Sequence, residues 1–165
     1  MSRELDGNKS FFKSEADKNY MTREHGRVAK ATVAKTMLAA DDKLDIYDYE
    51  SGMTIFMDCS AADGGGEIVL PKPAVGLSYR IIASAAWANQ TIVMKSYSVD
   101  STRAQVNTVF YGVLMDTACN VLIGSAGLTF VANLIEKGDV IDLVSDGSGW
   151  HVIAYTQTAG AITVA

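Results

Sequence analysis

The sequence predicts an all-β protein, a β-sandwich or a jelly-roll-like barrel with an extended N-terminal arm. From about Asp45 onward, short β-branched and aromatic segments alternate with glycine-containing turns, at the spacing of about 8–12 residues that is typical of such folds. After Ala40, no segment of useful length has the apolar spacing of a helix. The chain of 165 residues is long enough for one domain with a substantial core. We place that domain at residues 41–165 and the arm at residues 1–40.

The first strands of the body are marked by alternation and by proline. Met53, Ile55 and Met57 alternate with their neighbours, which predicts a half-buried strand. Residues 67–70 form the next predicted strand, which stops at Pro71 because proline cannot donate to a β-ladder. Further strands are expected at residues 77–84, 91–97, 105–115, 121–123 and 128–131.

The clearest predicted element is a β-hairpin near the end of the chain. Residues 140–144 alternate between two faces, with either the odd-numbered or the even-numbered residues pointing inward. Residues 145–149, Ser-Asp-Gly-Ser-Gly, form a turn cluster, and residues 150–155 return as a second strand. Residues 161–165 are apolar, and we expect them to be buried in the core or in a contact between subunits. Together with the Val-rich strands, this end favours an oligomer.

Charge divides the chain at about residue 35. Residues 1–35 carry eight Lys or Arg and five Asp or Glu side chains, a net charge of +3, whereas residues 36–165 carry six and 14, a net charge of −8. The acidic body argues against a protein that wraps nucleic acid, because such binding requires neutralised phosphates. The basic, apolar-poor start is typical of an arm. Within it, a short helix is expected from Arg27 to Leu38.

Three interpretations of the arm are open: an unattached terminus, an arm that orders against a protein partner, and an arm that binds nucleic acid. The third is disfavoured because the five acidic residues dilute the positive field. In the second, aromatic residues would anchor the arm, and basic residues would guide it to an acidic protein surface. The candidate partner-binding residues are Phe11, Phe12, Tyr20, Met21, Arg23 and Arg27.

The sequence offers no catalytic or metal-binding constellation, so we expect no enzymatic activity, no cofactor, no metal and no small-molecule substrate. His25 lies in the arm, and His151 is expected to be a surface or interface residue. Cys59 and Cys119, 60 positions apart, show no zinc-ligand spacing. We expect two reduced thiols, with a disulfide as the alternative if the protein acts outside the cell. The acidic residues 41–50 are interpreted as a solvated link rather than a calcium site.

No apolar run approaches the roughly 20 residues of a membrane span. The N-terminal residues also lack the apolar core of a secretion signal. We therefore expect a soluble protein with no membrane partner.

Two stretches resemble segments that recur in virion proteins of tailed bacteriophages: residues 67–82, EIVLPKPAVGLSYRII, and residues 138–152, GDVIDLVSDGSGWHV. Across about residues 51–152, the chain is similar to small β-structured head decoration (cement) proteins. The resemblance implies a homotrimer on the outer capsid surface that is made in the host cytoplasm, binds the major capsid protein and stabilises the head. The basic arm lies outside the resemblance and is expected to provide the anchor.

Two other functions remain open at this point. The same β body could belong to a tail fibre or a baseplate. Alternatively, the chain could be a carbohydrate-binding module that recognises a glycan through Trp87, Trp150 or the tyrosines. Against the second reading, large aromatic residues in β proteins are more often part of the core or of an interface.

Overall fold

The computed structural model describes residues 23–24, 27–28, 31–38, 43–62, 65–87, 91–97, 110–116 and 119–164. The chain divides into two compact units, Met1–Ala31 and Thr32–Ala165. In the first unit, β1 (Arg23–Glu24) pairs antiparallel with β2 (Arg27–Val28). The second unit contains the remaining strands.

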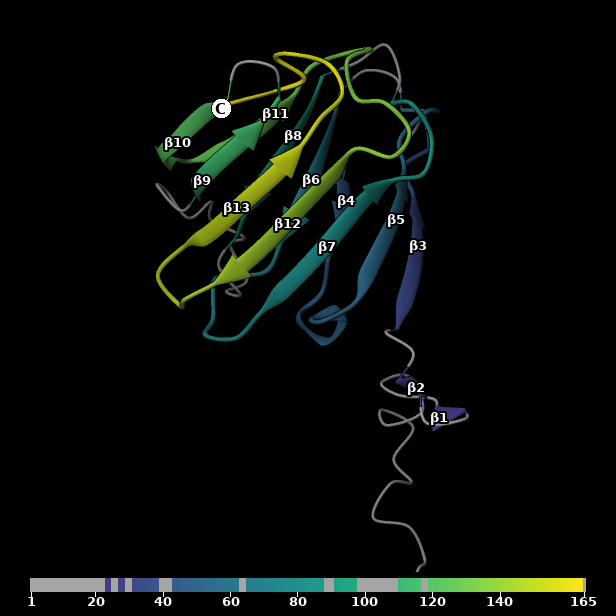
Figure 1. The fold of residues 1–165 in the computed structure, drawn as a ribbon, viewed down its shortest axis with the longest axis vertical. Coiled ribbons are helices and arrows are strands. Elements are labelled where there is room, and N and C mark those ends of the chain that lie inside the picture. Colours follow the sequence, from purple (N-terminus) through teal and green to yellow (C-terminus); the bar gives the residue numbers. More distant parts are fainter. Residues whose placement is uncertain are drawn as a thin grey trace, which may run out of the picture. The chain divides into compact units, whose positions relative to one another are not determined.

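The second unit consists of two β-sheets that pack face to face, with the seven-stranded sheet in front of the other in Figure 1. Its strand order is β10-β9-β13-β12-β7-β5-β3, and the order of the five-stranded sheet is β14-β11-β8-β6-β4. Both sheets mix parallel and antiparallel pairs. This arrangement confirms the all-β prediction and is a sandwich.

The seven-stranded sheet contains β3 (Thr32–Thr36), β5 (Thr54–Asp58), β7 (Ser78–Ala83), β9 (Phe110–Met115), β10 (Asn120–Ser125), β12 (Val140–Ser145) and β13 (Trp150–Tyr155). The five-stranded sheet contains β4 (Lys43–Asp45), β6 (Gly66–Leu70), β8 (Ile92–Ser96), β11 (Gly127–Phe130) and β14 (Ile162–Val164). A 3-10 turn, η2 (Asp48–Glu50), lies between β4 and β5 in the chain.

The predicted hairpin is confirmed as the antiparallel pair β12–β13. The structure also decides which face of β12 points inward: Ile141 and Leu143 are buried, whereas Val144 is exposed. Likewise Ile55 and Met57 of β5 are completely buried. In both strands, the odd-numbered residues form the inner face.

A buried tryptophan of one sheet donates a hydrogen bond to a buried serine of the other. Trp150, at the start of β13, is completely buried, and its indole Nε1–H donates to Ser96 Oγ at the end of β8 (3.2 Å). The Ser96 hydroxyl in turn donates to the carbonyl oxygen of Pro71 (2.7 Å). Tyr79 lies beside the Trp150 ring, with their centroids 5.6 Å apart. The two sheets are therefore joined by a hydrogen bond as well as by apolar packing.

At one end of the strand order, a lysine of a buried ion pair links the two sheets. The Lys35 ammonium of β3 lies 2.9 Å from Glu50 Oε1 and donates to the carbonyl oxygen of Asp45 in β4 (2.6 Å). Glu50 also accepts a hydrogen bond from the backbone N–H of Tyr47 (2.8 Å). The Glu50 carboxylate is therefore buried and paired, although the sequence had suggested a solvated acidic link for this segment.

The prediction of a short helix from Arg27 to Leu38 is wrong. Arg27–Val28 forms β2, and Thr32–Thr36 forms β3, which pairs in parallel with β5 at the edge of the large sheet. Its alternation of Thr32, Val33, Ala34, Lys35 and Thr36 places Val33 and Lys35 on the inner side. This period of two and the β-branched residues favour a strand, so the body begins at Thr32 rather than at residue 41.

The apolar end of the chain is buried partly within its own sandwich. Val131 N–H donates to the carbonyl oxygen of Ala161, and β14 pairs with β11. Ala161 and Ile162 are buried, whereas Val164 is exposed. The burial of the first two residues needs no second subunit.

Gly112 of β9 occupies a position that has no room for a side chain. Its φ is +145°, and a Cβ atom there would lie 1.9 Å from the carbonyl oxygen of Val152 on the neighbouring strand β13. We predict that Gly112→Ala lowers the free energy of unfolding by about 3 kcal/mol, through overpacking and backbone strain. Chemical denaturation measures the change. Gly76→Ala, at φ +88° in open space, is the control with an expected cost of about 1 kcal/mol; equal costs for the two would contradict the close approach.

Removing the cation from the buried pair should destabilise the fold strongly. Lys35→Met leaves the Glu50 carboxylate buried without its positive charge, and we expect a loss of about 3–5 kcal/mol in the free energy of unfolding. The matched control is Lys43→Met, which breaks an ion pair with Glu67 (3.2 Å) whose lysine side chain is 45% exposed. There we expect about 0–1 kcal/mol. A Lys35→Met variant as stable as the control would show that the pair does not hold this edge.

Candidate functional site

The partner-binding residues that the sequence singled out lie in the first unit. Phe11, Phe12, Tyr20 and Met21 fall outside the described residues. The backbone of Arg23 and Arg27 lies in β1 and β2, where Arg23 faces Val28 and Glu24 faces Arg27. Their role in partner binding stays a prediction.

The outer face of the seven-stranded sheet presents mainly apolar and aromatic side chains. The strand registers place six of them side by side in one row across six strands. In the order of the strands, they are Met115, Tyr155, Val140, Ile82, Phe56 and Ala34. Met115, Tyr155 and Phe56 are 42%, 51% and 39% exposed, respectively. We call this set of residues the apolar row.

Two shorter rows adjoin the apolar row on the same face. In one, Val121, Val113 and Ile153 lead to the ion pair between Asp142 and Arg80. In the other, Tyr111, His151 and Val144 lie side by side. Val121, Ile153 and Val144 are all exposed. We call the three rows together the apolar face.

The Arg80–Asp142 pair is bidentate. Arg80 Nε donates to Asp142 Oδ1 (2.7 Å) and Nη2 donates to Oδ2 (2.6 Å), so both carboxylate oxygens are used. These hydrogen bonds, together with the negative charge of Asp142, raise the pKa of Arg80 above its usual range. The two charges of the pair cancel in the middle of the apolar face.

His151 lies at the margin of this face, next to the β12–β13 turn. Its Nε2 is 2.9 Å from Asp146 Oδ2, and both side chains are about half exposed. Hydrogen bonds from His151 and from Ser148 hold the pKa of Asp146 below its ordinary value. Ser148 Oγ donates to Asp146 rather than to His151. The three side chains thus stabilise the β12–β13 turn. The sequence predicted a surface or interface position for His151, and its side chain is about half exposed.

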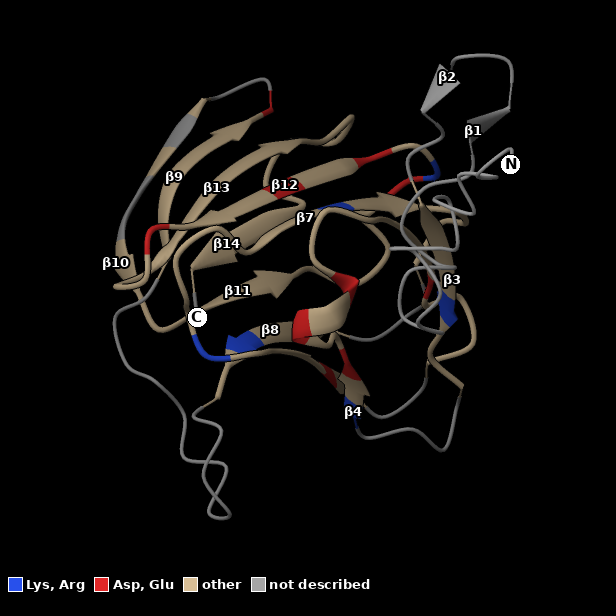
Figure 2. Cartoon of the chain, turned by 90° about the horizontal axis from the view of Figure 1, so that it is seen from below, with Lys and Arg blue, Asp and Glu red and all other residues tan. Residues whose placement is uncertain are grey.

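The outer face of the five-stranded sheet is polar by contrast. Glu67 on β6 accepts hydrogen bonds from Lys95 Nζ (2.7 Å) and Tyr97 Oη (2.9 Å), and Lys43 Nζ lies 3.2 Å away. Burial alone would raise the pKa of Glu67, but the hydrogen bonds from these groups outweigh burial and lower it. Figure 2 shows charged segments on β4 and β8, whereas β13 is uncharged along its length.

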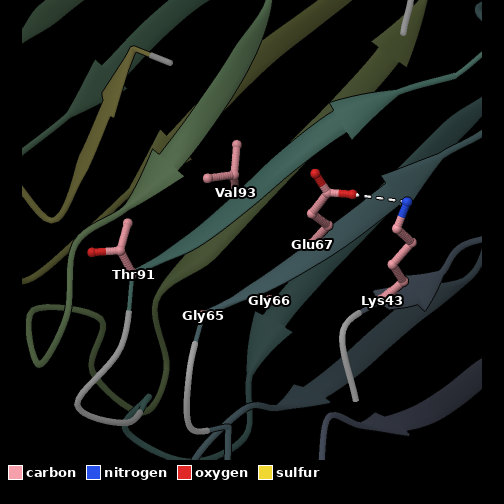
Figure 3. Close-up of a pocket in the computed structure, with 6 residues that line it drawn as sticks. All are labelled: Lys43, Gly65, Gly66, Glu67, Thr91 and Val93. Atoms are coloured by element: carbon pink, nitrogen blue, oxygen red, sulfur yellow. Dashed lines mark ion pairs between the residues drawn. The ribbon is translucent and has the colours of Figure 1, made fainter. Parts of the chain in front are cut away.

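A shallow hollow of about 390 Å³ lies beside this cluster. Lys43 and Glu67 form its charged wall (Figure 3). Its other lining residues are Gly65, Gly66, Thr91 and Val93. Because the carboxylate is already matched by two lysines, the hollow presents paired charges rather than a free acid or base.

The two tryptophans named for the carbohydrate alternative belong to the core. Trp150 is fully buried, and Trp87 is 4% exposed and packs edge-on against Phe130, with centroids 4.9 Å apart. Neither indole face is available to a sugar. The exposed aromatic pair is instead Tyr47 and Tyr49, stacked with their ring centroids 5.1 Å apart.

Both cysteines are free thiols. Cys59 is buried, and burial, with the neighbouring Asp58 charge, raises its pKa to about 12. A thiol that remains protonated at neutral pH is a poor nucleophile. Cys119 is exposed, with its sulfur 3.8 Å from that of Met115.

In the part of the chain that the structure describes, no group of three or more His, Cys, Asp or Glu residues is arranged to hold a metal ion. Within the same residues, no helix is long and apolar enough to cross a membrane. The most extensive candidate for function among the described residues is therefore the apolar face.

Comparison with protein-family models, curated proteins and solved structures gives no match for this chain.

The Glu67 cluster should make stability depend on pH in a defined direction. Because the folded-state pKa of Glu67 is lowered, its stabilising contribution is complete above the unfolded pKa of about 4.3 and is lost as pH falls below it. We predict that Glu67→Gln is less stable than the parent at pH 7 and that the difference shrinks toward pH 3. Denaturation midpoints across this range measure it. Glu136→Gln, which removes the same charge from an exposed loop, controls for net charge; a constant difference for Glu67→Gln would refute the role of the cluster.

Proposed function

We propose that the chain is a structural virion protein, a decoration protein that binds the outer surface of a phage head as a homotrimer and stabilises it. The observation that carries the proposal is the apolar face on a rigid sandwich. Contiguous exposed apolar surface of this kind marks sites of protein–protein contact. The resemblance of residues 67–82 and 138–152 to phage virion proteins supports the assignment to a particle.

The two units would have different tasks in such a protein. The sandwich would serve as a stiff, non-enzymatic body, because its sheets are joined through Trp150 and Ser96 and through Lys35 and Asp45. The first unit would reach the major capsid protein. Three arms on one trimer would act together, because after the first arm binds the others are held at a high effective concentration.

A trimer that spans the junctions between capsid subunits would oppose their separation. Internal DNA pushes the head outward, and the decoration protein would resist this expansion without doing any chemistry. We therefore expect heads that lack the protein to open under milder conditions than decorated heads, and we place the protein on the capsid surface.

A tail-fibre or baseplate component remains the nearest alternative, because the apolar face would suit assembly there as well. Copy number separates the two, since a decoration protein is present in hundreds of copies per particle and a fibre in a few. A carbohydrate-binding module loses the support of Trp87 and Trp150, which are buried, and would have to use exposed tyrosines such as the stacked pair Tyr47 and Tyr49.

Removing residues 1–31 should separate folding from head binding. A chain that starts at Thr32 keeps β3, whose pairing with β5 and buried Lys35 belong to the sandwich. We predict that it folds and oligomerises like the full chain but no longer cosediments with undecorated heads. A truncation that also removes Thr32–Thr36 is the control and should be destabilised. Head binding by the Thr32 chain at full strength would refute the anchoring role of the arm.

A further inference from the structure

The apolar face is too large and too continuous to be scattered surface hydrophobics. Its three rows extend from Val121 on β10 to Ala34 on β3, across the seven strands of the sheet. With about 4.8 Å between strands and about 6.6 Å between successive residues on one face of a strand, its 14 positions cover about 440 Å². A patch of this size matches the largest apolar patch of a typical monomer, which is often functional.

The described part of the sandwich leaves this face uncovered. Its outer residues Met115, Tyr155, Ile153, Val144 and Phe56 are between 39% and 53% exposed. Figure 1 shows the seven-stranded sheet on one side of the body, with the five-stranded sheet behind it. Since the inner face is already filled by the core, only another molecule or another part of the chain can cover the outer one.

The charges of the body restrict which occupant fits. Residues 32–165 carry seven basic and 14 acidic side chains, a net charge of −7. On the apolar face, however, Arg80 and Asp142 neutralise each other, and β9, β10 and β13 contribute no Lys, Arg, Asp or Glu. A basic or acidic partner would find no opposite charge on this face. A neutral apolar partner would find a surface like its own.

We infer that the occupant is a second copy of this chain and that the apolar face is the contact between copies. A second copy brings an equally neutral and apolar surface. It also brings its own Arg80–Asp142 pair, and a cation and an anion side by side can match the same pair turned around in a neighbour. Each copy therefore covers the exposed apolar face of the other with an apolar face of its own.

The area agrees with a weak contact. Covering the face on two copies removes about 880 Å² of surface from water, the size of a transient interface rather than of a permanent one.

This inference deepens the proposed function and rests on it only for the number of copies. It is therefore tested with the purified full chain in the absence of heads, by light scattering and sedimentation up to about 1 mM protein. We expect an oligomer of the parent chain. A chain that stays monomeric across this range would overturn the inference, while leaving head binding by the arm open to its own test.

The decisive variants are Tyr155→Lys and Phe56→Lys, each of which places an unpaired cation in the apolar row. Each should raise the dissociation constant of the oligomer by about 30-fold or more, the effect of losing an interface anchor. The matched control, Thr163→Lys, adds the same charge at an exposed strand position of the other sheet and should leave the oligomer intact. Denaturation curves verify that each variant is folded.

The pattern of outcomes distinguishes the possibilities. Folded variants that dissociate while the control does not support the apolar face as the contact. An oligomer that survives both substitutions would overturn it. Three copies agree with the proposed decoration protein; two copies would support the contact and contradict the trimer of that proposal.

Salt provides an independent readout. Two full chains of net charge −5 repel each other, so association through a neutral apolar face should strengthen as salt rises from about 0.05 M to about 0.5 M and screens the repulsion. Association that weakens over this range would show that opposite charges hold the copies together, and would overturn the inference.

Discussion

The rest of the structure depends on one constraint: the inner faces of the two sheets must be complementary. The hydrogen bond from Trp150 on β13 to Ser96 on β8 shows this complementarity. An indole and a hydroxyl buried between the sheets have to pair with each other or with the backbone, because no water reaches them. Ser96 satisfies both needs by accepting from Trp150 and donating to Pro71. The registers of β8 and β13 are thereby fixed relative to each other, and with them the residues that point outward.

Parallel pairing imposes a second constraint on the same sheet. β9 and β13 run in the same direction, so the chain has to cross from one end of the sandwich to the other between them. Gly112 allows the two backbones to approach where any side chain would meet Val152. The pairing brings Tyr111 beside His151 and Met115 beside Tyr155. The β9 and β10 part of the apolar face thus depends on one glycine.

Local patterns in the sequence predicted most of the sandwich. Alternation around Ile55, the proline stop after β6 and the turn at residues 145–149 are local signals, and the structure has strands where they were expected. β3 and β4 were missed because their signals are short and polar. Thr32–Thr36 contains a lysine that would ordinarily be exposed, and only its partner Glu50, 15 residues later, makes burial favourable.

The apolar face could not be assembled from the sequence, because its rows join residues from strands that are far apart in the chain. Met115 and Tyr155, or Val140 and Ile82, become neighbours only through the strand order. One local signal was nevertheless present. In β12, Val140 and Val144 are apolar although they lie opposite the buried Ile141 and Leu143, and a strand that is apolar on both sides is typical of one that is covered on both sides.

The two outer faces of the sandwich therefore solve different physical problems. On the five-stranded sheet, Glu67, Lys43 and Lys95 satisfy one another and keep that face compatible with water. On the seven-stranded sheet, one ion pair is surrounded by valine, isoleucine and aromatic side chains, whose exposure to water is unfavourable. Two sandwiches of net charge −7 repel each other in most orientations, whereas Asp142, the one carboxylate of the apolar face, is paired with Arg80. Contact through that face is the orientation in which repulsion is smallest and the gain from burial is largest, so the charge pattern directs the association that the apolar surface drives.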